Sequence, residues 1–216
     1  MNQLNHSLNY DIPILLLIWN RPKKLEKVLN IIKKIKPKYI YVSCDGPRPN
    51  NIEDELKINL CKSLINKYIV WDCEIKTHYA KMNHGCAIGV SKAITWFFEN
   101  VDKGIILEDD CLPHLDYFAF AKELLYKYEF DYKIWCIGAL NLQNGGFIGE
   151  GSYYFSNYNH CWCWATWKTR WAFYDHKLKE WPKFIKSDLF KRVIPNKKER
   201  DFWMKYIYKV INKDKP

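Results

Sequence analysis

The chain has 216 residues, 48% of them hydrophobic and 17% aromatic, which is enough apolar material for one large or two small domains with a continuous core. The excess of 34 basic over 24 acidic residues favours an anionic partner: nucleic acid, an acidic lipid surface or a phosphorylated small molecule. The longest apolar run, 12–19, contains Pro13 and falls well short of the roughly 20 residues that span a bilayer, so we expect no transmembrane anchor.

The eight cysteines do not suggest a disulfide framework. Most of them lie in or beside apolar runs, and no secretory signal precedes them, so we expect reduced thiols in a cytoplasmic protein. Cys161 and Cys163 with His160 could form part of a zinc site. A second cysteine pair is missing, however, and tryptophans flank these positions, which argues against zinc.

The first strand and helix follow a polar leader at residues 1–11. The run 12–19 is continuously apolar, as expected of a strand buried on both faces. Asn20, Arg21 and Pro22 end it, and Pro22 suits the first turn of a helix because its missing N–H costs nothing there. Apolar residues then recur at helical spacing, which predicts an amphipathic helix over 22–36.

The next strand is predicted at 39–44 and ends in Asp45-Gly46-Pro47. A helix at 52–67 follows, with Leu56, Leu60, Leu64 and Ile65 on its apolar face, and then a third strand at 68–75. Successive strand–helix units predict an α/β fold with a Rossmann-like, open, mostly parallel sheet flanked by helices. Ligands of such sheets bind beyond the carboxyl ends of the strands, where Asp45 is placed.

A polar segment with one glycine, residues 81–87, leads into a helix predicted to end near Asn100. Helix N-termini attract phosphate, which makes Asn83 a candidate contact for a phosphorylated ligand. The alternative is an ordinary loop and helix cap.

The most informative stretch is the apolar run 104–107, which ends in Glu108, Asp109 and Asp110. Pro113 then stops further strand pairing because it lacks an N–H. Two like charges in contact repel by about 4 kcal/mol in an effective dielectric near 20, so three adjacent carboxylates at a strand exit favour a bound cation. A divalent metal with oxygen ligands meets this need, and a solvated turn is the alternative.

The remaining chain is predicted to contain a helix at 114–129 and a buried strand at 134–139, whose polar exit begins near Asn141. The strand–helix alternation stops after residue 146, so we divide a single domain into a regular half, 12–146, and a Trp-rich half, 147–216. In the latter we expect a short strand at 153–155, a helix with Trp164, Trp167 and Trp171 on one face, and basic helices at 183–193 and 197–212. Trp162 precedes the Trp-rich helix and is the best candidate among the tryptophans to line a ligand site.

Four motifs span most of the chain: Pro13-Ile14-Leu15-Leu16-Leu17-Ile18-Trp19-Asn20-Arg21-Pro22, Val42-Ser43-Cys44-Asp45-Gly46, Ile105-Ile106-Leu107-Glu108-Asp109-Asp110 and Cys161-Trp162-Cys163-Trp164-Ala165-Thr166-Trp167. Together they resemble glycosyltransferases of the GT-A type, and more closely N-acetylglucosaminyltransferase one and its bacterial relatives. The Glu-Asp-Asp triplet is this group's version of the Asp-x-Asp signature.

The resemblance implies that 12–146 is a nucleotide-sugar-binding half and 147–216 an acceptor half, and it implies a set of site residues. Arg21 and Asp45 match residues that hold the nucleotide of a UDP-sugar, the arginine on phosphate and the aspartate near uracil. Glu108 and Asp109 match the ribose and neighbouring positions, and Asp110 matches the residue that ligates Mn²⁺ or Mg²⁺. Such a metal would bridge the two phosphates and neutralise the leaving diphosphate. The acceptor sugar is expected near Asn141 and Trp162.

Two departures from the family pattern concern the acceptor half. The Trp-Gly-Trp of relatives is Trp162-Cys163-Trp164 here, so a loop that needs the conformational freedom of glycine is altered. The family continues to a Trp-Asp-x-x-Trp-like segment that supplies the general base. Asp201-Phe202-Trp203 has a passing likeness to it, and we favour a chain truncated before the base over Asp201 being that base.

The function that we expect is an inverting, metal-dependent glycosyltransferase acting in the cytoplasm on a glycan or lipid-linked acceptor, in surface polysaccharide or glycolipid synthesis. Basic charge and surface aromatics would help it sit peripherally at the anionic inner face of the membrane. One alternative is a remnant that binds nucleotide-sugar without turnover. Another is a nucleotidyltransferase, although Trp19-Asn20-Arg21-Pro22 is unlike the glycine-rich phosphate loop of that class. We expect no nucleic-acid binding because no recognised module is present.

Overall fold

The structure, a computed structural model, describes residues 10–143, 146 and 149–212. The chain divides into two compact units, Met1–Ala172 and Phe173–Pro216, which we describe separately. The change of character that we expected after residue 146 does not end the sheet, because a strand at Trp164–Trp167 still belongs to it.

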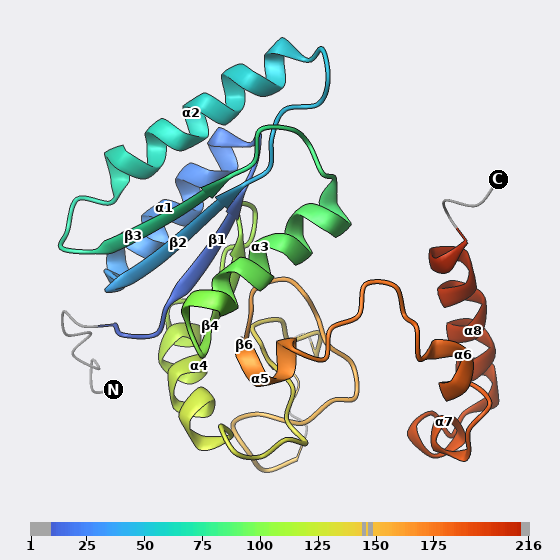
Figure 1. The fold of residues 1–216 in the computed structure, drawn as a ribbon. Helices are drawn as coiled ribbons and strands as arrows, with labels where there is room; N and C mark the ends of the chain where they lie inside the picture. Colours follow the sequence, from blue (N-terminus) through green and yellow to red (C-terminus); the bar gives the residue numbers. More distant parts are fainter. Residues whose placement is uncertain (1–9, 144–145, 147–148, 213–216) are drawn as a thin grey trace. The chain divides into compact units, whose positions relative to one another are not determined.

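The first unit is built on a six-stranded sheet (Figure 1). Its strand order is β3-β2-β1-β4-β6-β5. The first four strands of this order pair in parallel, whereas β6 is antiparallel to both β4 and β5. The strands are β1 (Ile14–Ile18), β2 (Tyr39–Cys44), β3 (Glu74–Tyr79), β4 (Lys103–Glu108), β5 (Ile137–Gly138) and β6 (Trp164–Trp167).

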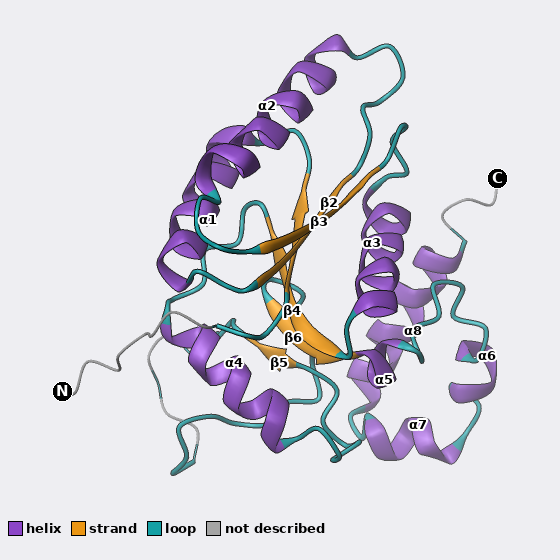
Figure 2. Cartoon of the chain, turned by 60° about the vertical axis from the view of Figure 1, so that its left-hand side comes forward, coloured by secondary structure: helices purple, strands orange, loops and turns teal. Residues whose placement is uncertain are grey.

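Helices cover both faces of the sheet, as Figure 2 shows for α1 and α2 on one side and α3 on the other. The helices are α1 (Pro22–Ile35), α2 (Ile52–Tyr68), α3 (Cys86–Asn100), α4 (Asp116–Lys127) and the single turn α5 (Lys168–Trp171). This arrangement confirms the prediction of an α/β fold with a mostly parallel sheet flanked by helices.

Burial of β1 on both faces explains its continuous apolar run. Leu16 and its alternate neighbours pack in the core beneath α1, α2 and α4, whereas Leu15 and Leu17 pack in the core beneath α3. The same alternation divides β4, where Ile105 and Ile106 belong to different cores. Side chains of one strand point alternately to the two faces, so only a run without polar positions fits between two helix layers.

The predicted third strand at 68–75 is wrong in position. Helix α2 continues to Tyr68, and β3 begins only at Glu74. Because β3 is an edge strand with mostly exposed side chains, polar residues such as Lys76 suit it better than the apolar segment that we chose. On α2, Leu64 and Ile65 are buried as expected, but Leu56 and Leu60 are exposed.

The Trp-rich segment is a strand rather than the predicted helix. Residues 164–167 form β6, which pairs with β4 through Ile106 opposite Trp164 and Lys103 opposite Trp167. The spacing of the tryptophans fits a helix, but the edge of β4 needs a partner for its buried N–H and C=O groups. Tertiary pairing therefore overrides the local periodicity.

Two further predicted strands differ from the structure. The strand at 134–139 shrinks to β5, because the Ile134 and Trp135 carbonyls accept from the side chains of Arg170 and Thr166 instead of from a neighbouring strand. Residues 153–155 form no strand. Tyr153 instead packs against aromatic rings of α4 and its C-terminal end.

Over its described residues, 173–212, the second unit contains the helices α6 (Trp181–Phe184), α7 (Asp188–Val193) and α8 (Lys197–Ile211). The predicted helix at 183–193 is interrupted because the Ser187 hydroxyl accepts from the Phe190 N–H and starts a new helix. Rings of Trp181, Phe184 and Phe190 pack together within 6.0 Å of one another. The helix predicted at 197–212 is confirmed as α8. Within the described ranges, none of the helices has the length and apolarity to span a bilayer.

Candidate functional site

The candidate site lies where β1, β2 and β4 end. The sheet register pairs Ile18 with Cys44 and Leu17 with Glu108, so the three strands finish at nearly the same level. The chain runs from β1 outward to β2 and β3 and then returns to place β4 on the other side of β1, so strand order reverses between β1 and β4. Such a reversal point, beyond the carboxyl ends of the strands, is where open α/β sheets bind ligands.

Side chains from the exits of β1 and β4 meet in an ion-pair cluster of Arg21, Lys24, Asp109 and Asp110, which we name the β4 exit cluster. Arg21 Nη2 lies 2.6 Å from Asp109 Oδ1, and its Nη1 lies 2.6 Å from Asp110 Oδ2. Lys24 Nζ lies 3.3 Å from the same Asp110 oxygen. The sequence prediction that Arg21 and the acidic exit lie together is thus confirmed for Asp109 and Asp110.

The two aspartates of the β4 exit cluster differ in exposure. The Asp109 side chain is fully buried and also accepts a 3.0 Å hydrogen bond from the Trp19 backbone N–H. The Asp110 side chain is 28% exposed, and its two ion-pair partners are the partly exposed side chains of Arg21 and Lys24. Asp109 therefore serves to fix the exit of β1 against β4, whereas the partners of Asp110 can be exchanged for a ligand.

Burial dominates the electrostatics of the acidic exit. It raises the pKa of Asp109 above its ordinary value, while Arg21 and the Trp19 N–H act in the opposite direction. The pKa of Glu108 is also raised, first by burial and then by the charge of Asp110, with Arg21 opposing. The repulsion that we expected among the three carboxylates is met in part by cations of α1.

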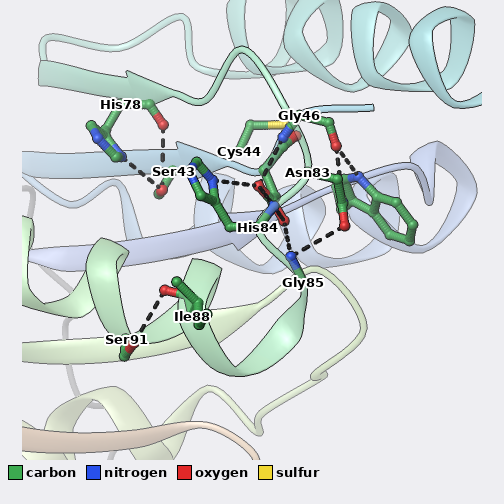
Figure 3. A network of polar contacts seen from close by, with 11 residues as sticks. Ser43, Cys44, Gly46, His78, Asn83, His84, Gly85, Ile88 and Ser91 are labelled. Atoms are coloured by element: carbon green, nitrogen blue, oxygen red, sulfur yellow. Dashed lines mark hydrogen bonds and ion pairs between the residues drawn. The ribbon is translucent and has the colours of Figure 1, made fainter. Parts of the chain in front are cut away.

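Asp45, at the exit of β2, holds the loop before α3 by backbone hydrogen bonds. Its carboxylate accepts from the N–H groups of Gly46, His84 and Gly85 at 2.9 to 3.1 Å. The His84 ring Nδ1 also lies 3.3 Å from Asp45 Oδ1. Figure 3 shows the labelled loop residues His84 and Gly85 in this network.

The entry to α3 is thus already occupied by a carboxylate of the chain. Gly85, the N-cap of α3, has a φ of 77°, a conformation that glycine adopts without strain. A Cβ on Gly89 would lie 3.1 Å from Asp45 Oδ2, so glycine there lets the carboxylate approach the first turn of the helix. This geometry favours the loop-and-cap alternative over phosphate binding at this helix N-terminus.

Asn83 belongs to the same loop and contacts backbone groups. Its Nδ2 donates to the Gly46 carbonyl at 3.0 Å, and its Oδ1 accepts from the Gly85 N–H at 3.1 Å. The Trp19 indole Nε1 donates to the same Gly46 carbonyl at 3.0 Å. Trp19 and Asn83 therefore tie the exits of β1 and β2 to the loop before α3.

A second buried carboxylate, Asp54 at the start of α2, was not among the predicted site residues. It accepts from Arg48 Nε at 2.7 Å, from Arg48 Nη2 at 3.0 Å and from Asn20 Nδ2 at 2.6 Å. The hydrogen bonds from Arg48 hold the pKa of Asp54 well below its ordinary value. The guanidinium carbon of Arg48 in turn lies 5.2 Å from the centroid of the Trp19 ring, which it covers. Asp54 thus supports the loops that frame the site.

A pocket of about 200 Å³ lies between these strand exits and α3. Arg21, Asp45, Asn83 and Glu108, four of the predicted donor residues, line it together. Trp19, Ser43, His78, His84, Gly89 and Lys92 contribute further lining groups. The pocket is thus bounded by apolar side chains with a few charged and polar groups, the composition of a small-molecule site.

Two predicted residues of the first unit, Asn141 and Trp162, lie outside the pocket. Asn141 is exposed after β5, and its Oδ1 accepts from the Gln143 N–H. Trp162 precedes β6, is 57% exposed and stacks with His160 at a ring distance of 6.4 Å. Neither residue lines the pocket. Asp201 lies on α8 in the second unit, so its relation to the first unit stays a prediction.

The side chains at the strand exits offer few ligands for a metal ion. Among the residues that the structure describes, no group of three or more His, Cys, Asp or Glu side chains could hold a metal ion. At the end of the acidic exit, Asp110 offers a partly exposed carboxylate, a hard oxygen ligand of the kind that Mg²⁺ and Mn²⁺ accept. A metal there would take its other ligands from substrate phosphates and water, a common arrangement for Mg²⁺.

Sequence reasoning missed Lys24, Trp19 and His84 as parts of the site. Lys24 could have been found, because it follows Arg21 by three residues at the start of a helix and therefore lies on the same face. The contacts of Trp19 and His84 depend on long-range packing between strand exits, and no local pattern marks them.

Comparison with protein-family models and with curated proteins gives no match. Among solved structures, the chain is similar to the crystal structure of HddC from Yersinia pseudotuberculosis, with 16% sequence identity and a TM-score of 0.34. The match covers 56% of this chain and 55% of that one, so the chain spans about half of HddC. This similarity is too low to assign the chain a fold family or a function.

Proposed function

We propose that the chain is a GT-A type glycosyltransferase that uses a nucleoside-diphosphate sugar, with a UDP-sugar as the first candidate. Its acceptor would be a glycan or a lipid-linked sugar at the cytoplasmic face of a membrane, and the transfer would invert the anomeric centre. The family resemblance of the strand exits and the geometry of the first unit support this proposal.

The observation that carries the proposal is the juxtaposition of Arg21 with Asp109 and Asp110 beside a pocket lined by Asp45, at the reversal point of the sheet. A nucleotide needs an apolar pocket for its base and cations for its phosphates. The pocket and the β4 exit cluster supply these two environments side by side, because Arg21 belongs to both.

The start of α1 is suited to a diphosphate. Arg21 and Lys24 lie at this helix end, and the first turn of α1 contains no acidic residue. The partial positive charge of the helix N-terminus adds to the charge of the two side chains. In α3, by contrast, Asp45 already fills the position of an anion.

Asp110 would hold Mn²⁺ or Mg²⁺ together with the diphosphate. When bound, the metal supplies positive charge that neutralises the leaving nucleoside diphosphate. In this arrangement Lys24 Nζ and Arg21 Nη1, which pair with Asp110 in the structure, would contact phosphate oxygens of the donor instead. Arg21 Nη2 would stay paired with the buried Asp109, which also accepts from the Trp19 N–H.

Asp201 is the candidate general base, and Asn141 and Trp162 are candidates for acceptor contacts. All three remain proposals from the resemblance. If the chain has no competent base, it would still bind the donor, and the activity would reduce to nucleotide-sugar binding.

The test is calorimetric titration of UDP with and without Mn²⁺, followed by an assay of UDP release from a panel of UDP-sugars with and without added acceptor glycans. Metal-dependent UDP binding with turnover supports the whole proposal. Binding without turnover supports the donor site alone and would make the chain a binding protein. Absence of UDP binding contradicts both.

A further inference from the structure

The positive charge of the chain is concentrated in its second unit. Residues 173–216 contain 13 of the 34 Lys and Arg residues but only 6 of the 24 Asp and Glu residues, which gives this unit +7 of the formal +10. The first unit, four times as long, carries the remaining +3. A charge this uneven points to an anionic partner for the second unit in particular.

Figure 1 shows α8 as the last helix of the chain. In its sequence, lysines and aromatic residues alternate along one face. Positions 198, 202, 205, 206 and 209 are spaced i, i+4, i+7, i+8 and i+11, so they share one face of the helix. All five side chains are exposed, and we name this face the α8 stripe. Its members are Lys198, Phe202, Lys205, Tyr206 and Lys209.

The aromatic members of the α8 stripe are large and open to solvent. Phe202 is 57% exposed and Tyr206 is 51% exposed, and their rings stack with centroids 6.1 Å apart. On the opposite side of the helix, Met204 and Ile207 are partly buried. The helix therefore has an inner apolar side and an outer side that is both basic and aromatic.

We propose that the α8 stripe docks the protein onto a membrane surface rich in anionic phospholipid. Helix α8 lies in the plane of the head groups, where the ammonium groups of Lys198, Lys205 and Lys209 contact lipid phosphates. Phe202 and Tyr206 enter the boundary between head groups and acyl chains, a depth at which aromatic rings are favoured. Neither charge nor rings alone suffices, because stable peripheral binding takes two signals.

A lipid surface explains more of the second unit than a nucleic acid does. Basic and aromatic residues together also suit single-stranded nucleic acid, on which the rings would stack with bases. However, the same unit exposes four aliphatic side chains, Leu189, Val193, Val210 and Ile211, by 37% to 47%. Aliphatic side chains gain nothing against a polyanion, whereas a bilayer offers them hydrocarbon.

The experiment is co-sedimentation of the full chain with vesicles of phosphatidylcholine alone and of phosphatidylcholine mixed with phosphatidylglycerol. We expect binding only to the mixed vesicles, weakening as the salt concentration rises. Combining Lys198→Gln, Lys205→Gln and Lys209→Gln should weaken this binding on the order of a hundredfold. Phe202→Ser with Tyr206→Ser leaves the charge unchanged and should weaken it by roughly tenfold or more.

The matched control removes three lysines from one exposed face of α1: Lys23→Gln, Lys27→Gln and Lys34→Gln. It lowers the net charge by the same amount and should keep most of the vesicle binding.

Equal losses of vesicle binding in the two lysine variants would overturn the proposal. Wild-type binding to both vesicle types alike, or to neither, would also overturn it. An unchanged Phe202 and Tyr206 variant would overturn the insertion of the rings. Binding to a single-stranded oligonucleotide but not to vesicles would assign the stripe to nucleic acid. Circular dichroism checks that each variant is folded. The comparison of the two vesicle types with the wild-type protein does not depend on the folding of any variant.

Discussion

Asp45 and Asp110 both follow strands of one sheet, yet their partners are of different kinds. Asp45 accepts hydrogen bonds from three backbone N–H groups, which belong to the fold and cannot turn away. Asp110 is paired with two side-chain cations that reach solvent, Arg21 at 38% and Lys24 at 57% exposure. A carboxylate held by backbone groups shapes the site, whereas a carboxylate held by side chains is available to a metal or ligand.

Within the acidic exit the same contrast separates Asp109 from Asp110. Asp109 is buried and fixed by the Trp19 N–H, while Asp110 reaches solvent. Two neighbouring residues of one motif therefore have different tasks. Variants of the two residues should therefore affect the stability of the fold and the binding of a ligand to different extents.

The largest effect on stability is expected for Asp109→Ala. The change leaves the Trp19 backbone N–H and Arg21 Nη2 without their acceptor. We expect this to lower the free energy of unfolding by about 3 kcal/mol. Asp110→Ala breaks a partly exposed ion pair and should cost less than about 1 kcal/mol. Urea denaturation followed by tryptophan fluorescence measures both, and equal losses would contradict the division of tasks.

An intermediate effect is expected for Asp45→Ala, which removes the acceptor of three backbone N–H groups before α3. We expect a loss of about 2 kcal/mol and faster amide hydrogen exchange in the loop at Gly85. Exchange in β4 serves as the internal reference. If protection of the loop stayed at the wild-type level, Asp45 would not be what orders it.

A pH dependence of stability is expected for Asp54→Asn. The pKa of Asp54 in the folded chain lies below the ordinary value of 3.8, so the charged carboxylate stabilises the fold above that pH and loses this contribution as the pH falls toward the folded-state pKa. Asparagine does not titrate. The wild type should therefore be more stable than the variant at neutral pH, and the gap should narrow below pH 3.8. Denaturation curves at neutral and acidic pH measure the difference in unfolding free energy between the two proteins. A difference independent of pH would show that the charge of Asp54 does not stabilise the fold.

The sheet and the meeting of Arg21 with the acidic exit could be predicted from the sequence because their signals are local. The apolar runs at Leu15 and Ile106 require burial on both faces, and turn residues such as Pro22 mark where strands end. The parallel connection of such units places their exits at one edge. Arg21 and Asp110 were therefore expected together, and they are in contact.

The Trp-rich segment could not be predicted in the same way. The spacing of Trp164 and Trp167 is compatible with a helix, and only the free edge of β4, a feature of the tertiary structure, selects a strand. The shortening of β5 likewise depends on Arg170 and Thr166, which bond its carbonyls from distant positions. The division after Ala172 leaves the place of Asp201 relative to the donor site to experiment.

The central claim is that Asp110 binds a divalent metal together with a nucleoside diphosphate. Calorimetric titration of UDP into wild type and Asp110→Asn, each with and without Mn²⁺, tests it most directly. Asp116→Asn is the charge-matched control, because the Asp116 carboxylate is 80% exposed on α4. We predict that Mn²⁺ strengthens UDP binding to wild type and to the control but not to Asp110→Asn. The same metal dependence in all three proteins, or no UDP binding by the wild type, would contradict the account.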